Sequence, residues 1–361
     1  MNSSSSRLVF ILVESVRFHG VGRPQPRSVE STTQVSPQSF HSLYAPRRRD
    51  YEQQYGVKAR LGPDGHHFFD RRSGINVLID EVRPAQNSWS RAPRQVSVAL
   101  TNVCDLHCAY CYAPKTKASL TADQVLAWLI ELDNAGCFAV GFGGGEPTLH
   151  PQFAVICRRA ARETRLAVTF TTHGHRLTDQ LLQSLAESVN FVRVSVDGVG
   201  ATYETQRGRK YDELVVRLGS LARVLPFGLN VVVNHRTIDE LDALADLAHG
   251  FKATELLLLP QQATVAVGGV SQALAQRLKE WVCNYAGPVR LAISEAGADG
   301  LPTCDPLPGE RGLRAYAHID ASGMLRASSY AAASAPIGET GVMAALDRLQ
   351  NTFGIQRGTN S

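Results

Sequence analysis

The segment "TNVCDLHCAYCYAPK", which begins at Thr101, decides the fold because it directly follows the apolar run "QVSVAL", which begins at Gln95. The run is typical of a β-strand, so the cysteines would stand at its carboxyl end, where barrel-type active sites are built. Thiolates are the usual ligands of iron–sulfur clusters, and three of them can hold a cubane while one iron stays open. The segment therefore predicts a metal site. Its ligands, spaced C-x3-C-x2-C, are Cys104, Cys108 and Cys111.

The other cysteines support metal ligation rather than a disulfide framework. The chain has 7 cysteines in 361 residues, which indicates a reducing compartment, and the cytoplasm is the expected location. Structural zinc would require a fourth ligand from a second short-spaced pair, and His107 lies inside the cysteine loop, where its geometry is unsuitable. Buried, inert positions are expected for Cys137, Cys157 and Cys283.

Composition argues against two classes of partner. The 37 basic and 33 acidic residues leave a net charge of +4, so no nucleic-acid partner is expected, and Arg47–Arg49 is interpreted as a solvated linker. The apolar run Leu8–Val13 is too short to span a bilayer and has no basic start. No membrane segment is expected elsewhere.

Short β-branched runs alternate with longer amphipathic segments between residues 95 and 259, a pattern typical of βα units and a parallel sheet. Six strands are expected, and periodicity alone leaves both a partial barrel and a doubly wound sheet open. They begin at Gln95, Phe138, Leu166, Phe191, Leu229 and Glu255.

Helix boundaries support this count of units. Thr121–Gln124 and Thr237–Glu240 have the spacing of capping boxes, and Gly136 and Gly250 stand where helix ends favour glycine. Another helix is expected over Ser271–Tyr285.

At the cysteine segment the sequence resembles the radical SAM superfamily, whose loop is C-x3-C-x-aromatic-C; Tyr110 takes the aromatic position. The resemblance implies one [4Fe-4S] cluster on the three cysteines, with S-adenosyl-L-methionine (SAM) at the open iron. It also implies an α/β fold, a partial (β/α)6 TIM-like barrel rather than a doubly wound sheet. An N-terminal β-hairpin cap and a small α+β C-terminal extension complete the expected fold.

Further segments resemble the family's motifs in the expected order. "GGGEP", from Gly143, is similar to its GGEP motif, which implies that Gly144, Gly145 and Glu146 contact the amino group of SAM; an ordinary glycine-rich turn is the alternative. "TTHG" is similar to the T-N-G turn, which places Thr172 at the cofactor. His173 replaces the usual asparagine, and a surface turn histidine is expected.

Two later strand ends complete the expected cofactor site. In "SVDG" and "QRG" the resemblance implies that Ser195 and Arg207 bind the carboxylate or ribose of SAM. Asp197 could bind ribose or cap the following turn. Asn234, after the fifth strand, would face the cofactor, and "LLLLPQQ" at 256–262 would lie beside adenine.

Four regions are expected: a disordered extension at 1–50, the cap at 51–94, the radical SAM core at 95–262 and an extension at 263–361. The last resembles the SPASM or twitch module, with Cys304 before its turn and Gly323 in it. Ser328 stands where the second cysteine would be, so the auxiliary cluster site is incomplete. Cys304 could donate hydrogen or bind substrate, although a lone cysteine is more often structural.

The resemblance implies reductive cleavage of SAM to a 5′-deoxyadenosyl radical that abstracts hydrogen from substrate. An external electron donor such as flavodoxin or ferredoxin would supply the electron. Modification of a ribosomal peptide is the first expectation. Redox or rearrangement chemistry on a small metabolite, such as a sugar, aminocyclitol or cofactor precursor, is the second, and a non-catalytic SAM- or cluster-binding protein is the third.

Overall fold

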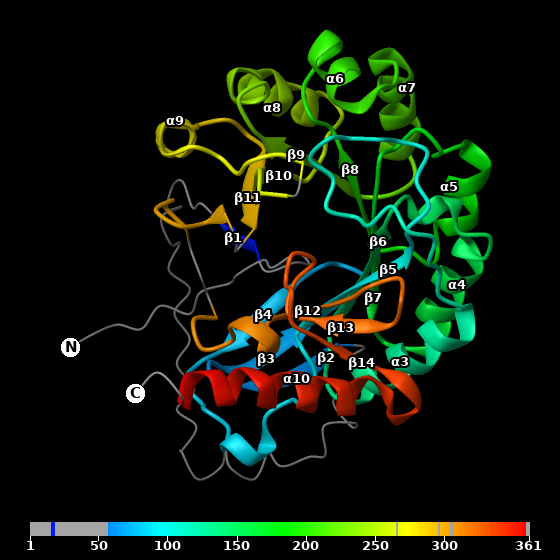
Figure 1. Cartoon of the computed structure of the whole chain (residues 1–361), viewed down its shortest axis with the longest axis vertical. Coiled ribbons are helices and arrows are strands. Elements are labelled where there is room, and N and C mark those ends of the chain that lie inside the picture. Colours follow the sequence, from blue (N-terminus) through cyan, green and yellow to red (C-terminus); the bar gives the residue numbers. More distant parts are fainter. Residues whose placement is uncertain (1–15, 19–56, 265, 295–296, 304–306, 359–361) are drawn as a thin grey trace, which may run out of the picture.

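The computed structural model describes residues 16–18, 57–264, 266–294, 297–303 and 307–358 (Figure 1). They form one sheet of 11 strands, in the order β1-β11-β10-β9-β8-β7-β6-β5-β12-β13-β14, and a second sheet of 3 strands, β2-β3-β4. The strands are β1 (Val16–Phe18), β2 (Lys58–Gly62), β3 (Gly65–Phe69), β4 (Asn76–Ile79), β5 (Gln95–Thr101), β6 (Ala139–Gly144), β7 (Ala167–Thr172), β8 (Phe191–Ser195), β9 (Phe227–Val233), β10 (Glu255–Pro260), β11 (Arg290–Ser294), β12 (Tyr316–Ile319), β13 (Met324–Arg326) and β14 (Ser334–Pro336).

Helices follow the strands in regular alternation, and Figure 1 shows α3 to α8 along the outer side of strands β5 to β10. This arrangement is the expected βα repeat. The helices are α3 (Ala122–Asn134), α4 (Phe153–Glu163), α5 (Asp179–Leu185), α6 (Gly200–Arg207), α7 (Tyr211–Ala222), α8 (Leu241–Gly250), α9 (Gln272–Asn284) and α10 (Gly341–Gly358).

Strands β5 to β11 pair in parallel and in chain order. The six predicted strands are confirmed as β5 to β10, and the fold is the expected α/β arrangement around a parallel sheet. Strand β11, which has three apolar residues between Arg290 and Ser294, was not among the predicted strands. The sheet ends at β1 and β14, so it is open among the described residues.

Side chains alternate between the two faces of each parallel strand. On β9, Leu229 and Val231 belong to the main core under the helices, so Asn230 points to the opposite, inner face. On β5 the core residues are Val96 and Val98, so Ser97 is also on the inner face. The inner face thus carries polar side chains, whereas the outer face is apolar.

The first predicted helix start is confirmed in both of its bonds. Gln124 N donates to Thr121 Oγ1 (3.3 Å), and Thr121 N donates to Gln124 Oε1 (3.1 Å). Gly136 follows the end of α3 with φ 98°, a conformation that glycine adopts without steric cost.

The second predicted start is right in position but not in its bonds: a 3-10 helix, Ile238–Glu240, follows Thr237 directly, but the Thr237 side chain does not cap it. The Thr237 hydroxyl donates to Val232 O (2.7 Å) and accepts from Asn234 N (2.9 Å), so the end of β9 occupies it. Helix α8 begins later, at Leu241. Gly250 is the last residue of that helix, and the left-handed residue beyond it is Lys252, with φ 58°.

The small sheet β2-β3-β4 lies against the amino-terminal end of the parallel strands. Phe69 of β3 packs on Phe138 with ring centroids 5.4 Å apart, in a buried cluster with the first residues of β6 and β7, Ala139 and Ala167. Buried Arg60 of β2 donates from Nε to Glu310 Oε1 (2.8 Å). These contacts hold the small sheet at the end of the strands opposite the cysteine segment.

The carboxyl-terminal strands continue the large sheet instead of forming a separate one. Strand β12 pairs in parallel with β5 and antiparallel with β13, and Gly323 turns between β12 and β13 with φ 79°. Helix α10 packs against α3 and β14 (Figure 1). The expected helix near residue 280 is confirmed as α9, with Leu274 N donating to Ser271 Oγ.

Several predictions about the ends of the chain fall outside the described residues. Cys304 and Arg47–Arg49 are among them, and so is nearly all of the extension expected at 1–50. Of that extension only Val16–Phe18 is described, and it pairs antiparallel with β11. Within the described ranges, no helix has both the length and the apolar character needed to cross a bilayer.

Candidate functional site

The three cysteines of the opening segment line one cavity of about 550 Å³, bounded by the inner faces of β5 to β12. All three are partly exposed, and none is bonded to another described cysteine. Cys137 and Cys157 are buried, as predicted, but Cys283 is exposed on α9, so the prediction of a core position for it is wrong.

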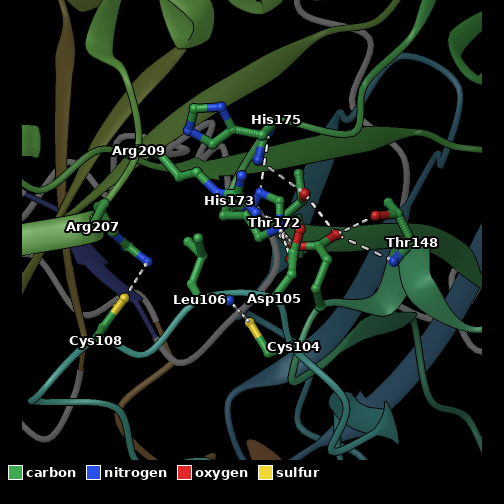
Figure 2. Close-up of polar contacts among 12 residues, drawn as sticks. Cys104, Asp105, Leu106, Cys108, Thr148, Thr172, His173, His175, Arg207 and Arg209 are labelled. Carbon is green, nitrogen blue, oxygen red and sulfur yellow. Dashed lines mark hydrogen bonds and ion pairs between the residues drawn. The ribbon is translucent and has the colours of Figure 1, made fainter.

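Two groups donate to the sulfurs of this loop (Figure 2). Leu106 N lies 3.4 Å from Cys104 Sγ, and Arg207 Nη1 lies 3.6 Å from Cys108 Sγ. Burial raises the pKa of the Cys104 thiol. Across the described residues, no three His, Cys, Asp or Glu side chains converge on a single ion.

The glycines after β6 let the next turn lie directly on the cysteine loop. Gly145 N donates to Thr101 O (2.7 Å), and Glu146 N donates to Val103 O (2.8 Å). A Cβ on Gly144 would clash with the Thr101 carbonyl, and one on Gly145 would clash with the Val103 carbonyl. These glycines are therefore required by backbone packing, whatever binds beside them.

Glu146 is a buried link between this turn and the end of β7. Its carboxylate accepts from the hydroxyl groups of Thr148 (2.6 Å) and Thr172 (2.8 Å), and from His173 N (2.9 Å). The side chain is 1% exposed. Both oxygens thus have protein partners, which include Thr148, Thr172 and His173, labelled in Figure 2.

His173 is buried, so the prediction of a surface turn histidine is wrong. Its Nε2 lies 2.9 Å from Asp105 Oδ1, and its Nδ1 accepts from His175 N (3.1 Å). Arg209 Nη2 reaches the other oxygen of Asp105 at 3.0 Å. Asp105 and Arg209 had not been predicted, and the position of Asp105 next to Cys104 was the available signal.

Asp197 is a second buried link. Its Oδ2 accepts from Tyr110 OH (2.5 Å) and Arg207 Nη2 (2.6 Å), and its Oδ1 accepts from Val232 N (2.7 Å). It does not cap the turn, because Val199 N donates to Glu240 instead. Burial and the adjacent Asp197 carboxylate raise the pKa of Tyr110.

The remaining predicted residues divide between two cavities. Ser195 lines the cysteine cavity, whereas Asn234 lines a neighbouring pocket of about 710 Å³. Asn234 Oδ1 accepts from Arg236 N (2.9 Å), and its Nδ2 donates to Gln261 Oε1 (3.1 Å). Arg207 and Tyr110 line both spaces. The structure therefore brings most of the predicted residues together, but Asn234 lines the neighbouring pocket and not the cysteine cavity.

The inner faces of the strands contribute polar groups that sequence reasoning missed. Ser97 Oγ lies 2.5 Å from Tyr316 OH and 2.6 Å from His318 Nδ1, and all three line the cysteine cavity. Arg193 and Asn230 line it from β8 and β9. Alternation along each strand was the signal that could have identified them.

A model of the radical SAM superfamily matches residues 98–248. Mycofactocin maturase MftC of Mycobacterium tuberculosis (strain ATCC 25618 / H37Rv) is 33% identical over 172 residues, covering 45% of this chain and 44% of that protein. GTP 3',8-cyclase of Mycolicibacterium smegmatis is 28% identical over 197 residues, covering 50% of this chain and 54% of that one. The chain thus spans about half the length of the curated relatives it matches.

Among solved structures, Streptococcus suis SuiB bound to precursor peptide SuiA superposes with a TM-score of 0.64 at 12% identity. The match covers 80% of this chain and 86% of that one. At this identity the likeness shows a shared fold, and it extends well beyond the segment matched by the family model.

Proposed function

Because residues 98–248 match the model of the radical SAM superfamily, we propose that this chain is an enzyme that binds a [4Fe-4S] cluster and SAM. The ligands would be Cys104, Cys108 and Cys111. When bound, the cluster would supply one electron to the sulfonium, and the 5′-deoxyadenosyl radical so formed would abstract hydrogen from substrate. A separate protein such as flavodoxin or ferredoxin would deliver that electron.

One observation carries the proposal: three free thiols from a single loop line the same cavity as the inner faces of the strands. The donor set suits an iron–sulfur cluster, because three thiolates leave one iron open toward that cavity. Zinc would need a fourth ligand. The turn at Gly144–Glu146 lies directly against this loop, which supports a SAM site beside the cluster.

The contacts to SAM belong to the same proposal. Arg207 lines the cavity, and its Nε is buried with no hydrogen-bond partner among the described residues, which suits an anionic group such as the SAM carboxylate. Ser195 offers a hydroxyl on the same side. Asp197 would act indirectly by holding Arg207 and Tyr110, since its own oxygens are occupied. Gly144, Gly145, Glu146 and Thr172 would shape the turn.

A peptide is the proposed substrate. Support comes from the names of two similar proteins, a mycofactocin maturase and a SuiB structure with its precursor peptide. Transformation of a small metabolite is the second candidate, and the similarity to GTP 3',8-cyclase favours it. Incubating the reduced enzyme with SAM and a deuterated peptide would distinguish the two candidates. Deuterium appears in 5′-deoxyadenosine if the peptide is the substrate, and it does not if the substrate is a small metabolite.

The test of the proposal is anaerobic reconstitution followed by reduction with SAM present. We expect [4Fe-4S] absorbance and release of 5′-deoxyadenosine, both lost when the three loop cysteines are replaced by alanine. Cys283→Ala is the matched control, because this thiol is exposed on α9. If the intact chain shows neither signal, the enzyme hypothesis is wrong. If it binds SAM and a cluster without cleaving SAM, the non-catalytic alternative holds.

A further inference from the structure

The cysteine cavity has polar side chains on its inner faces that, apart from Ser195, the proposed contacts to the cluster and SAM do not use. Asn230 lies midway along β9, level with Ser195 of β8 and Leu257 of β10. Its side chain is on the inner face, and the residue is 5% exposed. The Oδ1 atom is buried and finds no hydrogen-bond partner among the described residues. An unpaired buried amide oxygen costs about 1–3 kcal/mol, so a ligand that pairs with it gains affinity.

Arg193, which lines the cavity from β8, is already paired with a buried carboxylate. Arg193 of β8 donates from Nε (3.0 Å) and Nη2 (2.5 Å) to Glu255 Oε1, and Glu255 is fully buried. Arg290 of β11 adds a contact to Glu255 Oε2 at 3.0 Å. A carboxylate entering the cavity would therefore compete with Glu255 for Arg193 rather than meet a free cation.

The wall formed by β12, in contrast, carries no charged side chain at Tyr316 or His318. His318 is buried beside Ser97, and burial lowers the pKa of His318 to about 4, so the ring is neutral at pH 7. Ser97 and Tyr316 contribute hydroxyl groups that can donate or accept. A neutral polar group suits this wall better than an ion.

Space for a ligand comes from glycine on β6. Gly141 and Gly143 face the cavity without side chains. A Cβ added to Gly143 would meet no described atom within 4 Å. The inner layer therefore combines space, neutral hydroxyl and imidazole groups, and one amide oxygen that has no partner among the described residues.

We propose that Asn230 forms a subsite for a primary carboxamide of the substrate, such as an asparagine side chain of a peptide. An amide offers a donor and an acceptor in one plane, so two amides pair at two points, whereas a hydroxyl matches only one. The inference rests on the proposed function, because the cavity is then the place where the substrate reacts. The carboxyl-terminal extension takes part through His318 and Tyr316.

The test uses the reconstituted full chain with its cluster oxidised, so that no turnover occurs. The probes are the N-acetyl methylamides of asparagine, aspartate and leucine, titrated by ligand-observed NMR. Their backbones are identical, and only the side-chain head differs. We expect the asparagine probe to bind about tenfold more tightly than the other two.

Asn230→Leu should abolish the preference for the asparagine probe. If that variant does not fold, Asn230→Ser keeps a smaller polar group and should reduce the preference. Asn351→Leu, the same change at an exposed position on α10, is the matched control and should leave the preference intact. Equal affinity for the three probes, a preference for aspartate, or a preference that survives Asn230→Leu would overturn the subsite. Release of 5′-deoxyadenosine by the same preparation, once it is reduced with SAM present, shows whether the proposed function stands independently of this result.

Discussion

His173 Nε2 lies 2.9 Å from Asp105 Oδ1, which joins the end of β7 to the residue directly after Cys104. The other ring nitrogen of His173, Nδ1, accepts from His175 N at 3.1 Å. The residue that departs from the family's T-N-G turn thus holds the cysteine loop in place. Arg209 holds Asp105 from a different segment.

Replacing His173 should loosen the loop that carries Cys104. We expect His173→Ala to lose its cluster about five times faster than wild type under an iron chelator, since one hydrogen bond contributes about 1 kcal/mol. The decay of [4Fe-4S] absorbance measures this rate. His249→Ala, at an exposed position on α8, is the control. Equal rates for the two variants would show that the Asp105 contact does not stabilise the loop.

The glycine turn offers a matched pair of substitutions. Gly145→Ala forces a Cβ against the Val103 carbonyl, whereas Gly143→Ala places one in open space. We expect Gly145→Ala to lower the free energy of unfolding by about 1–3 kcal/mol and to reduce iron loading. Gly143→Ala should load normally. Iron analysis and denaturant unfolding provide the readouts, and similar loading of both variants would contradict the packing argument.

Arg207 and Asp197 form a buried pair that a double-mutant cycle can test. Arg207→Ala leaves a fully buried carboxylate without its cation, so we expect a loss of about 3–5 kcal/mol in the free energy of unfolding. Adding Asp197→Ala should recover part of that loss, because the unpaired charge is removed. If the losses from the two single variants simply add, the pair is not coupled.

A single cluster is expected for the whole chain. Ser328 stands where the auxiliary module would have a cysteine, and a hydroxyl is a poor ligand for iron. Reconstituted protein should contain about four irons per chain, with no decrease in Cys304→Ala. A count near eight, or a loss of iron in that variant, would show that a second cluster is present.

Linear patterns predicted the strands well because the outer face of each parallel strand packs under the helices and supplies apolar residues at regular intervals. The strand they missed, β11, has only three apolar residues between arginine and serine. Side-chain partners were harder to predict. His173 and Asp197 looked like turn residues, but both are buried because segments distant in sequence supply their partners.

At helix ends, too, local hydrogen bonds were predictable and tertiary contacts were not. Thr121 caps α3 as its local spacing predicts, since the capping bonds lie within four residues. Thr237 has the same spacing, but its hydroxyl bonds to the end of β9 instead. Cys283 lies in a predicted helix and is exposed, because helical periodicity does not by itself identify which side faces the core. Local chemistry was predictable where no tertiary contact competed with it.

The most direct test of the central claim is the electron paramagnetic resonance spectrum of the reduced, reconstituted chain with and without SAM. The iron that Cys104, Cys108 and Cys111 would leave without a protein ligand should bind the cofactor, so adding SAM should shift the g-values of the reduced cluster. Cys283→Ala should show the same shift. Identical spectra with and without SAM would contradict the assignment of these three cysteines to a SAM-binding cluster.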